Sequence, residues 1–173
     1  MEAQLENKRL KNLYHYDILD TPPDGAYDEI TLLATKIFNV PIAIISLVDS
    51  ERVWFKSSYG VDAEEVPRYP GMCSSAVMSD DIYIVEDARK DPRTMAHPLV
   101  AGIMGFQFYA AAPLKSLDGY NLGTFCIIDK EPRTLTIKEK SMLWQLSRIV
   151  MDNLELRLQT RLLVKDLQEK LNK

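Results

Sequence analysis

Two cysteines and two histidines are the side chains in this sequence that could support nucleophilic, redox or metal chemistry. Neither His15 nor His97 has a partner at a metal-binding spacing such as H-E-x-x-H or C-x-x-C. We expect His15 to be a surface or interface residue of an N-terminal helix. His97 precedes Pro98 in a loop, which makes it the better candidate for contact with haem or another ligand, although most such histidines are plain loop residues.

Cys73 is the stronger chemical candidate of the two cysteines. It follows Pro70-Gly71 at the expected N-terminus of a short helix, a position that lowers the pKa of a thiol. A reactive thiol there could serve redox sensing or covalent attachment of a cofactor, whereas the alternative is a buried small apolar residue. Cys126 lies inside an apolar strand and is expected in the core. A thiol-redox enzyme would become arguable if the two sulfurs lay within disulfide reach.

Other catalytic patterns lack their required context. Gly102 and Gly105 in AGIMGF are not set between a strand and a helix, and no G-K-[ST] sequence occurs. Ser74 and Ser75 have no G-x-S-x-G surroundings. The sequence therefore predicts a protein that is not an enzyme.

Composition narrows the remaining classes. The 173 residues carry 21 Lys+Arg and 25 Asp+Glu, a net charge of −4, so no basic surface for nucleic acid is expected. No apolar run is long enough for a membrane span, and the charged N-terminal MEAQLENKRLKNL does not resemble a secretory signal. We expect a cytoplasmic protein with free thiols, without nucleic-acid or membrane partners.

Any such side chains must be positioned by helices and strands that the apolar pattern predicts. Helices are expected in the first 20 residues and over 24–39, and a short one over 71–79. PIAIISLVD indicates a buried central strand, ERVWFKSSYG its hairpin partner and IYIVE a short strand, whereas GVDAEEVPRYPG is predicted to be a loop. Strands 106–114 and 121–128 are joined through Asp118-Gly119, a strong hairpin signal. This order predicts an α+β fold around an antiparallel sheet.

The segment from residue 136 onward contains no Gly or Pro and predicts one long helix. Thr136 and Glu139 form a capping-box pattern at its start. Leucines and valines recur every three to four residues, and the helix would be roughly 50 Å long, more than a compact domain needs. We predict a parallel homodimer through this helix. The alternative is a frayed tail or a return onto its own domain. The expected organisation is an N-terminal helix over 1–20, a sheet with loops and pocket over 21–135, and a signalling and dimerisation helix over 136–173.

Four stretches in order carry a resemblance to a known family: LYHYDILDTPPDGAYDEITLLATKIFNVPIAIISLVDSERVWFKS, GMCSSAVM, IVEDARKDPRTMAHPLVAG and FQFYAAAPLKSLDGYNLGTFCIIDKEPRTLT. Over residues 9–155 the chain resembles the GAF domains that precede histidine kinase or diguanylate cyclase modules in bacterial signalling proteins, two-component systems included. The resemblance implies a five- or six-stranded antiparallel sheet with the terminal helices on one face and a loop-enclosed pocket on the other. It also implies an effector module in the parent protein and output through the C-terminal helix.

Several departures from the family pattern bear on the ligand. FYAAAPL has Ala111 where the family usually has Gly, and Gln107 stands where Arg is common, which removes a partner for an anion. The Cys-His dipeptide of bilin-binding relatives and the N-K-x-F-D-E motif of cyclic-nucleotide binders are absent from the sequence. The cofactor is therefore unknown from the sequence, and the identity of the ligand stays open.

The primary hypothesis is a non-enzymatic sensory domain that binds a small molecule between the sheet and the 61–105 loops. The alternatives are a dimerisation or scaffolding domain without ligand and a thiol-dependent methionine sulfoxide reductase. Which strand face lines the pocket depends on register, because a one-residue slip exchanges the two faces. The candidate ligand-binding residues are Trp54, Cys73, Ser75, Asp87, Phe106, Phe108, Tyr109 and Cys126.

Overall fold

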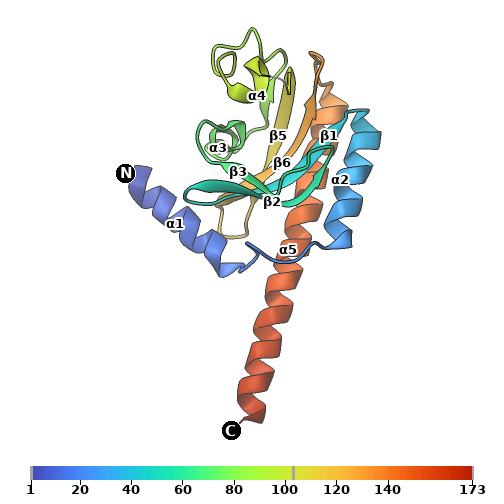
Figure 1. The fold of residues 1–173 in the computed structure, drawn as a ribbon. Helices are drawn as coiled ribbons and strands as arrows, with labels where there is room; N and C mark the ends of the chain where they lie inside the picture. Colours follow the sequence, from blue (N-terminus) through green and yellow to red (C-terminus); the bar gives the residue numbers. More distant parts are fainter. Residues whose placement is uncertain (1, 103, 173) are drawn as a thin grey trace.

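Eleven helices and strands make up the fold in the computed structural model, which describes residues 2–102 and 104–172. Their order along the chain alternates helical and strand segments around one sheet (Figure 1). The elements are α1 (Glu2–His15), α2 (Gly25–Phe38), β1 (Ile42–Val48), β2 (Arg52–Tyr59), β3 (Glu65–Pro67), α3 (Met72–Ala76), β4 (Tyr83–Val85), α4 (Pro98–Ala101), β5 (Phe108–Lys115), β6 (Asn121–Asp129) and α5 (Ile137–Leu171).

The sheet has six strands in the order β3-β2-β1-β6-β5-β4, and all of its pairs are antiparallel. The predicted α+β fold with an antiparallel sheet is thus confirmed. β1 and β6 lie at the centre, and every residue of β1 is buried, as its continuous apolar run predicts. The β5–β6 hairpin turns through Gly119, whose φ of +85° is a conformation that glycine adopts without strain.

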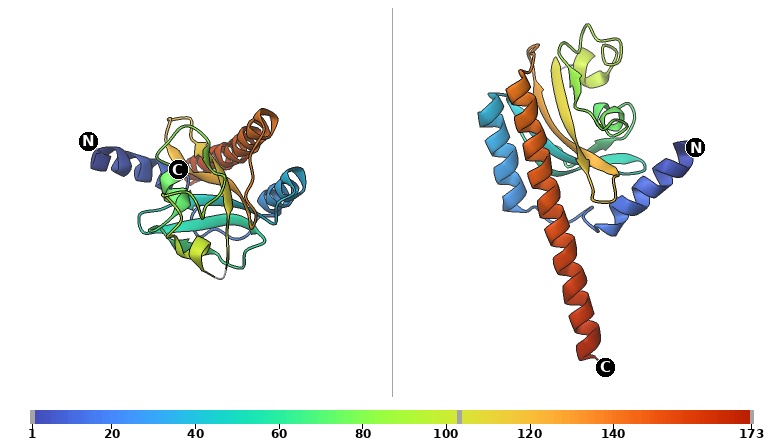
Figure 2. Two further views of the ribbon diagram at one scale, coloured as in Figure 1. Left: turned by 90° about the horizontal axis from the view of Figure 1, so that it is seen from above. Right: turned by 180° about the vertical axis from the view of Figure 1, so that it is seen from behind.

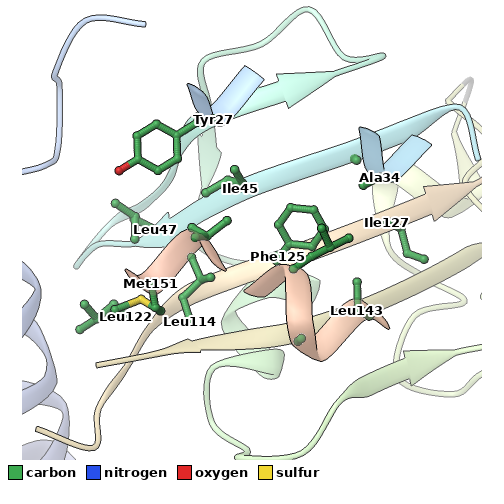
Figure 3. Packing of buried hydrophobic residues seen from close by; sticks show 14 of the residues in the cluster. Tyr27, Ala34, Ile45, Leu47, Leu114, Leu122, Phe125, Ile127, Leu143 and Met151 are labelled. Carbon is green, nitrogen blue, oxygen red and sulfur yellow. The ribbon is translucent and has the colours of Figure 1, made fainter. Parts of the chain in front are cut away.

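Two helices, α2 and α5, cover one face of this sheet (Figure 2). The apolar core under α5 includes Leu114, Phe125 and Leu143 (Figure 3). Alternate residues of β5 add Phe108, Ala110 and Ala112 to it. The two alanines leave the helix close enough for the Ser147 hydroxyl to donate to the Pro113 carbonyl at 2.9 Å. Small side chains on this face therefore serve close helix packing.

The long C-terminal helix begins at the predicted capping box. The Thr136 hydroxyl accepts from the Glu139 amide at 3.2 Å, and the Glu139 carboxylate accepts from the Thr136 amide at 2.7 Å. The apolar side of α5 is buried from Leu143 to Leu158, and beyond it the helix projects away from the sheet (Figure 1). None of the helices in the described part of the chain is long and apolar enough to cross a bilayer.

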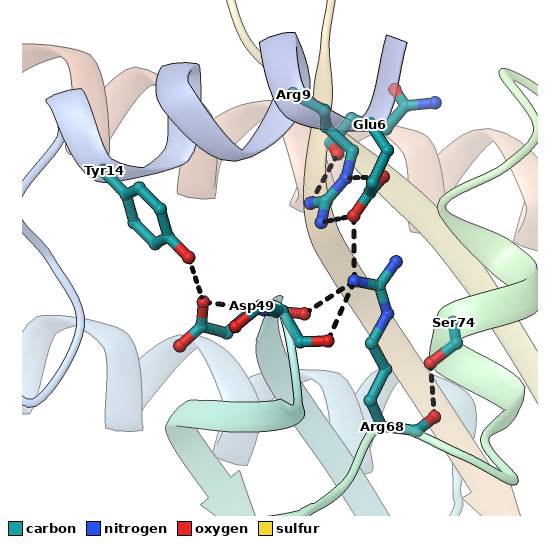
Figure 4. A network of polar contacts seen from close by, with 8 residues as sticks. Glu6, Arg9, Tyr14, Asp49, Arg68 and Ser74 are labelled. Carbon is teal, nitrogen blue, oxygen red and sulfur yellow. Dashed lines mark hydrogen bonds and ion pairs between the residues drawn. The ribbon is translucent and has the colours of Figure 1, made fainter. Parts of the chain in front are cut away.

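The N-terminal helix α1 is tied to the end of the sheet through an ion network (Figure 4). The Glu6 carboxylate accepts from Arg9 at 2.7 Å and pairs with Arg68 at 2.8 Å, and both arginines are 5% exposed. Tyr14 donates to the Asp49 carboxylate at 2.7 Å. These bonds fix α1 against the turn that follows β1 and the chain that follows β3.

At Gly123 the two central strands lie so close together that only glycine fits. Gly123 of β6 pairs with Leu47 of β1, and a Cβ there would lie 1.8 Å from the Ser46 carbonyl oxygen. No side chain larger than hydrogen fits without moving the two strands apart.

Two details of the sheet differ from expectation. The segment predicted as a loop after β2 contains β3, which pairs with β2 across an irregular connection. β5 begins at Phe108, and Phe106 lies on the opposite face from Phe108 although alternation would place them together. The reason is that Phe106 is outside the regular ladder, with its amide bonded to the Leu99 carbonyl.

Candidate functional site

A cavity of about 600 Å³ lies on the face of the sheet opposite α2 and α5. Its floor comes from β1, β2, β5 and β6, and its walls come from the segment after β2, from α3 and from the loop around α4. The lining is predominantly apolar, with two cysteines, two tyrosines, one histidine and one aspartate among it. The lining residues are Ile44, Val53, Phe55, Val61, Asp62, Ala63, Val66, Pro67, Tyr69, Pro70, Gly71, Met72, Cys73, His97, Pro98, Leu99, Met104, Phe106, Tyr109, Cys126 and Ile128.

Strand alternation decides which floor side chains face this cavity. Cys126 of β6 is paired with Ile44 of β1 and Ala111 of β5, and all three belong to the apolar cluster on the cavity side. Tyr109 shares the face of Ala111, whereas Phe108 points toward α5. Ala111 thus belongs to the packed apolar cluster on the cavity side of the sheet.

His97 fastens two parts of the wall to each other. Its Nδ1 accepts from the Leu99 amide at 3.1 Å, which leaves the proton on Nε2, and Nε2 donates to the Pro70 carbonyl at 3.1 Å. Both ring nitrogens are therefore used within the protein. The role of His97 in this geometry is to hold the α4 loop to the chain before α3, at the margin of the cavity.

The polar part of the floor is a cluster of thiols and hydroxyls. The Tyr109 hydroxyl donates to the Cys73 sulfur at 3.2 Å, and Tyr109 is 2% exposed. Beside them, the hydroxyls of Ser46 and Thr124 lie 2.9 Å apart across the β1–β6 pair. Both cysteines are free; Cys73 is half-buried and Cys126 is fully buried.

The protonation of this cluster is set by its internal contacts. The neighbouring Cys126 thiol lowers the pKa of Cys73, with a further lowering from the Tyr109 hydroxyl, against the opposing effect of burial. Contact with Cys73 and burial raise the pKa of Cys126 well above its ordinary range. Burial, and then the charge of Cys73, likewise raise the pKa of Tyr109, which keeps its hydroxyl a donor. The arrangement favours one thiolate, on Cys73.

The cavity offers little to anionic ligands or to metals. Its lining contains no lysine or arginine among the residues that the structure describes. Within those same residues, no group of three or more His, Cys, Asp or Glu side chains could hold a metal ion. Neutral polar contacts are what the floor supplies.

Four of the eight residues predicted from sequence line the cavity: Cys73, Phe106, Tyr109 and Cys126. Their contact with a ligand stays a prediction. The structure brings the two cysteines and Tyr109 together, and Phe106 lies in the same apolar cluster.

The other four lie elsewhere, and their placement in the pocket is wrong. Trp54 and Phe108 face the helices by strand alternation, since Val53 and Phe55 on either side of Trp54 line the cavity. Ser75 is exposed on the outer side of α3. The Asp87 carboxylate accepts from the Arg89 amide at 3.2 Å and stabilises a turn.

Sequence reasoning missed most of the wall. Phe55, Val61, Met72 and Leu99 were not singled out, although the segment that contains most of them was expected to enclose the pocket. The available signal was the presence of isolated apolar residues in otherwise polar, proline-rich loops. Such residues need an apolar surface to cover, and the sheet face provides it.

Comparison with known proteins gives a consistent family assignment. The model of the GAF domain family matches residues 22–153. A cyclic di-GMP phosphodiesterase of Pseudomonas aeruginosa is 38% identical over 147 residues, which are 84% of this chain and 25% of that protein. The chain thus spans about a quarter of the length of this relative.

Solved structures share the fold at low identity. The free methionine-R-sulfoxide reductase of Neisseria meningitidis, in complex with its substrate, superposes with a TM-score of 0.66 at 18% identity, over 92% of this chain and 94% of that one. The GAF domain of an Acinetobacter phosphoenolpyruvate-protein phosphotransferase gives a TM-score of 0.60 at 14% identity, over 94% and 98% of the two chains. At these identities the likeness concerns the fold alone.

Proposed function

This chain belongs to the GAF domain family, and from that premise we propose that it is a non-enzymatic sensory domain that binds a small neutral molecule in the cavity and relays binding through α5 in a homodimer. The general role, that of a sensory or regulatory domain of the kind found in signalling proteins, follows from membership of the family. The ligand and the dimer are the proposed parts.

The observation that carries the proposal is the open apolar cavity on the sheet. Its volume of about 600 Å³ lies within the range of pockets that hold small molecules, roughly 300–1,000 Å³. A few hydroxyl and thiol groups at its floor could orient a ligand, which is the usual division of labour in such sites. A cavity closed by the domain's own side chains would have favoured a scaffold without ligand.

The chemistry of the lining favours a neutral ligand. A phosphate or carboxylate placed in an apolar site needs a cationic or hydrogen-bonding partner. The described lining has no arginine or lysine, and both nitrogens of His97 are already bonded within the protein. We therefore favour a neutral aromatic or aliphatic molecule over a nucleotide, a bilin, haem or a free amino acid.

A ligand screen by thermal denaturation tests this function. Neutral probes such as indole and decanol should raise the melting temperature, because a ligand at 100 times its Kd stabilises by about 2.7 kcal/mol. Nucleotides, haem, bilins and amino acids are the comparison classes. No stabilisation by any class would contradict the sensory function, whereas stabilisation by an anionic class alone would contradict the neutral ligand.

A blocking variant and a matched control make the screen specific to the cavity. Ala63→Phe places a ring in the wall of the cavity, and Ala26→Phe places the same ring on the exposed surface of α2. Only Ala63→Phe should abolish the stabilisation by a neutral probe. Equal responses in the two variants would place the binding elsewhere.

The proposed relay uses a second apolar face of α5, distinct from the one packed on the sheet. Ile149, Leu156, Leu163 and Leu167 are 46%, 64%, 59% and 50% exposed and follow one another at helical spacing. A second copy of the helix would bury this face in a homodimer. Ligand would then act by favouring one arrangement of the helix pair, since equal affinity for both would change nothing. An effector module in the parent protein would receive the change.

Sedimentation of the purified chain tests the dimer. The wild-type protein should be dimeric at high concentration and dissociate on dilution, and Leu163→Glu/Leu167→Glu should be monomeric with unchanged circular dichroism. Gln168→Glu, on an exposed part of the same helix, is the control for added charge. A wild-type monomer at high concentration would contradict the dimer.

The same face of α5 supports a second candidate, a dimerisation or scaffolding domain that needs no ligand. A positive dimer result together with a negative ligand screen would favour it. The thiol-dependent methionine sulfoxide reductase is a third candidate because two thiols share the cavity, and Cys73→Ser in a reductase assay with free methionine sulfoxide tests it.

A further inference from the structure

Two free cysteines from distant parts of the chain meet at the floor of the cavity. Cys73 comes from the second residue of α3, and Cys126 from the middle of β6. Both line the cavity, and Cys73 packs against the apolar cluster that contains Cys126. Tyr109, from β5, directs its hydroxyl at the Cys73 sulfur over 3.2 Å. A sensory domain that only binds a neutral molecule has no need for this arrangement.

From this juxtaposition we infer that the cavity is a reactive dithiol site, in which an organic hydroperoxide oxidises Cys73 and Cys126 then closes an intramolecular disulfide. The inference goes beyond the proposed function, because oxidation requires neither a resident ligand nor the dimer. Its failure would leave reversible ligand binding untouched, and the ligand screen could fail while the dithiol still reacted.

The reaction balances in two steps. The Cys73 thiolate attacks the terminal oxygen of the hydroperoxide; an S–O bond forms, the O–O bond breaks, and the leaving alkoxide takes a proton to become an alcohol. Cys73 has then lost two electrons and is a sulfenic acid. The Cys126 sulfur attacks the Cys73 sulfur, an S–S bond forms, and the hydroxyl leaves as water with the proton of Cys126.

Cys73 is the attacking thiol for geometric reasons. It is the half-buried member of the pair and comes from α3, whereas Cys126 is fully buried in β6. The Tyr109 hydroxyl donates to its sulfur, which stabilises the thiolate. The lowered pKa of Cys73 and the raised pKa of Cys126 agree with this assignment.

Cys126 is placed to resolve the sulfenic acid. A disulfide needs the two Cβ atoms roughly 3.5–4.5 Å apart. Cys73 packs against the cluster that contains Cys126, on the same side of the sheet. α3 is a short helix of five residues, and its N-cap Gly71 makes no side-chain capping bond. A small shift of α3 over the sheet is therefore the movement that the bond would require.

The cavity selects the kind of oxidant. Any molecule that reaches the Cys73 sulfur by way of the cavity passes a wall formed largely by aliphatic and aromatic side chains, among them Phe55, Leu99 and Phe106. An alkyl or aryl hydroperoxide buries its apolar group against this wall, whereas hydrogen peroxide has no apolar group to bury. A free amino acid sulfoxide would leave its carboxylate without a cationic partner in the described lining.

The test treats the reduced full chain with cumene hydroperoxide under anaerobic conditions. We expect the mass of the intact protein to fall by two hydrogens. Neither cysteine should then react with a thiol reagent in denaturant. In Cys126→Ser the reaction should stop at a sulfenic acid on Cys73, which dimedone traps. In Cys73→Ser the reaction should slow by roughly tenfold or more, because the remaining thiol, Cys126, is fully buried and burial disfavours the reactive thiolate.

Tyr109→Phe keeps the test independent of any unfolding caused by the cysteine variants. It retains both thiols and the ring while removing the donor, so we expect slower oxidation at unchanged circular dichroism. Tyr59→Phe, on the exposed end of β2, is the matched control and should react like the wild type. Ala63→Phe should slow cumene hydroperoxide more than hydrogen peroxide.

Several outcomes would overturn the inference. Both thiols could survive the treatment, the disulfide could form only between chains, or Cys73→Ser could react as fast as the wild type. Equal rates for cumene hydroperoxide and hydrogen peroxide would show that the cavity does not select the oxidant. A wild-type rate in Tyr109→Phe would show that the Tyr109 hydroxyl does not activate Cys73. Disulfide formation with free methionine sulfoxide and not with hydroperoxide would indicate the reductase instead.

Discussion

The attachment of α1 to the sheet gives a prediction whose size follows from the structure. Glu6 is held between Arg9 and Arg68, at 2.7 and 2.8 Å, and the Glu6 side chain is 27% exposed. The hydrogen bond from Arg9 lowers the pKa of Glu6 from its ordinary 4.5 to about 2, with Arg68 adding to the effect against burial. Glu6→Gln removes the charge and leaves two buried guanidinium groups close together.

The expected loss of stability is about 2 kcal/mol near neutral pH. The full shift would correspond to roughly 3.4 kcal/mol at 1.36 kcal/mol per pKa unit, and partial exposure to solvent reduces it. Because the folded-state pKa lies below the unfolded one, the stabilisation is complete above about pH 4.5 and is lost as the pH falls toward 2. Near pH 3.5, about 1 kcal/mol of the difference between wild type and Glu6→Gln should have disappeared.

Urea unfolding followed by circular dichroism at several pH values measures this difference. Glu29→Gln, on the exposed surface of α2, is the matched control and should change stability by less than about 0.5 kcal/mol at every pH. The reasoning is refuted if Glu6→Gln costs no more than the control, or if its cost stays constant between neutral pH and about pH 3.5.

Three further substitutions test the packing by the same unfolding measurement. Gly123→Ala should destabilise by more than about 2 kcal/mol because its Cβ would meet the Ser46 carbonyl, whereas Gly25→Ala, which meets nothing within 4 Å, should be nearly neutral. Phe108→Ala should cost about 3–5 kcal/mol through loss of buried contact under α5, with neutral probes still binding the cavity; lost binding at retained fold would contradict its placement on the helix face. Thr136→Ala should cost about 1 kcal/mol by removing the cap of α5, and an unchanged midpoint would show that the capping box contributes nothing.

Local signals in the sequence were sufficient for several elements. The capping box at Thr136, the turn at Asp118-Gly119 and the end of α2 at Asn39 are all confirmed. Each depends on residues within four positions of one another, so the backbone geometry follows from local hydrogen bonds and permitted φ values. The continuous apolar run of β1 likewise predicted a strand buried on both faces.

The candidate site was predictable only where strand alternation held. Tyr109 and Cys126 face the cavity in regular strands, and the structure decided between Tyr109 and Phe108 because local sequence does not fix register. Trp54 was misplaced because it alternates with Val53 and Phe55, which line the cavity, and therefore faces the helices. Phe106 lines the cavity because it precedes the ladder of β5.

The sequence by itself determined the fold class, the hairpin, the helix ends and the presence of two thiols in a chain with few other reactive groups. Only the tertiary structure decided that Cys73 and Cys126, 53 positions apart (126 − 73), share one cavity floor with Tyr109. It also decided that Glu6 meets Arg68. The physical reason is the same in both cases: these contacts join elements that are distant in sequence, so they depend on how the sheet is ordered and which face each strand presents.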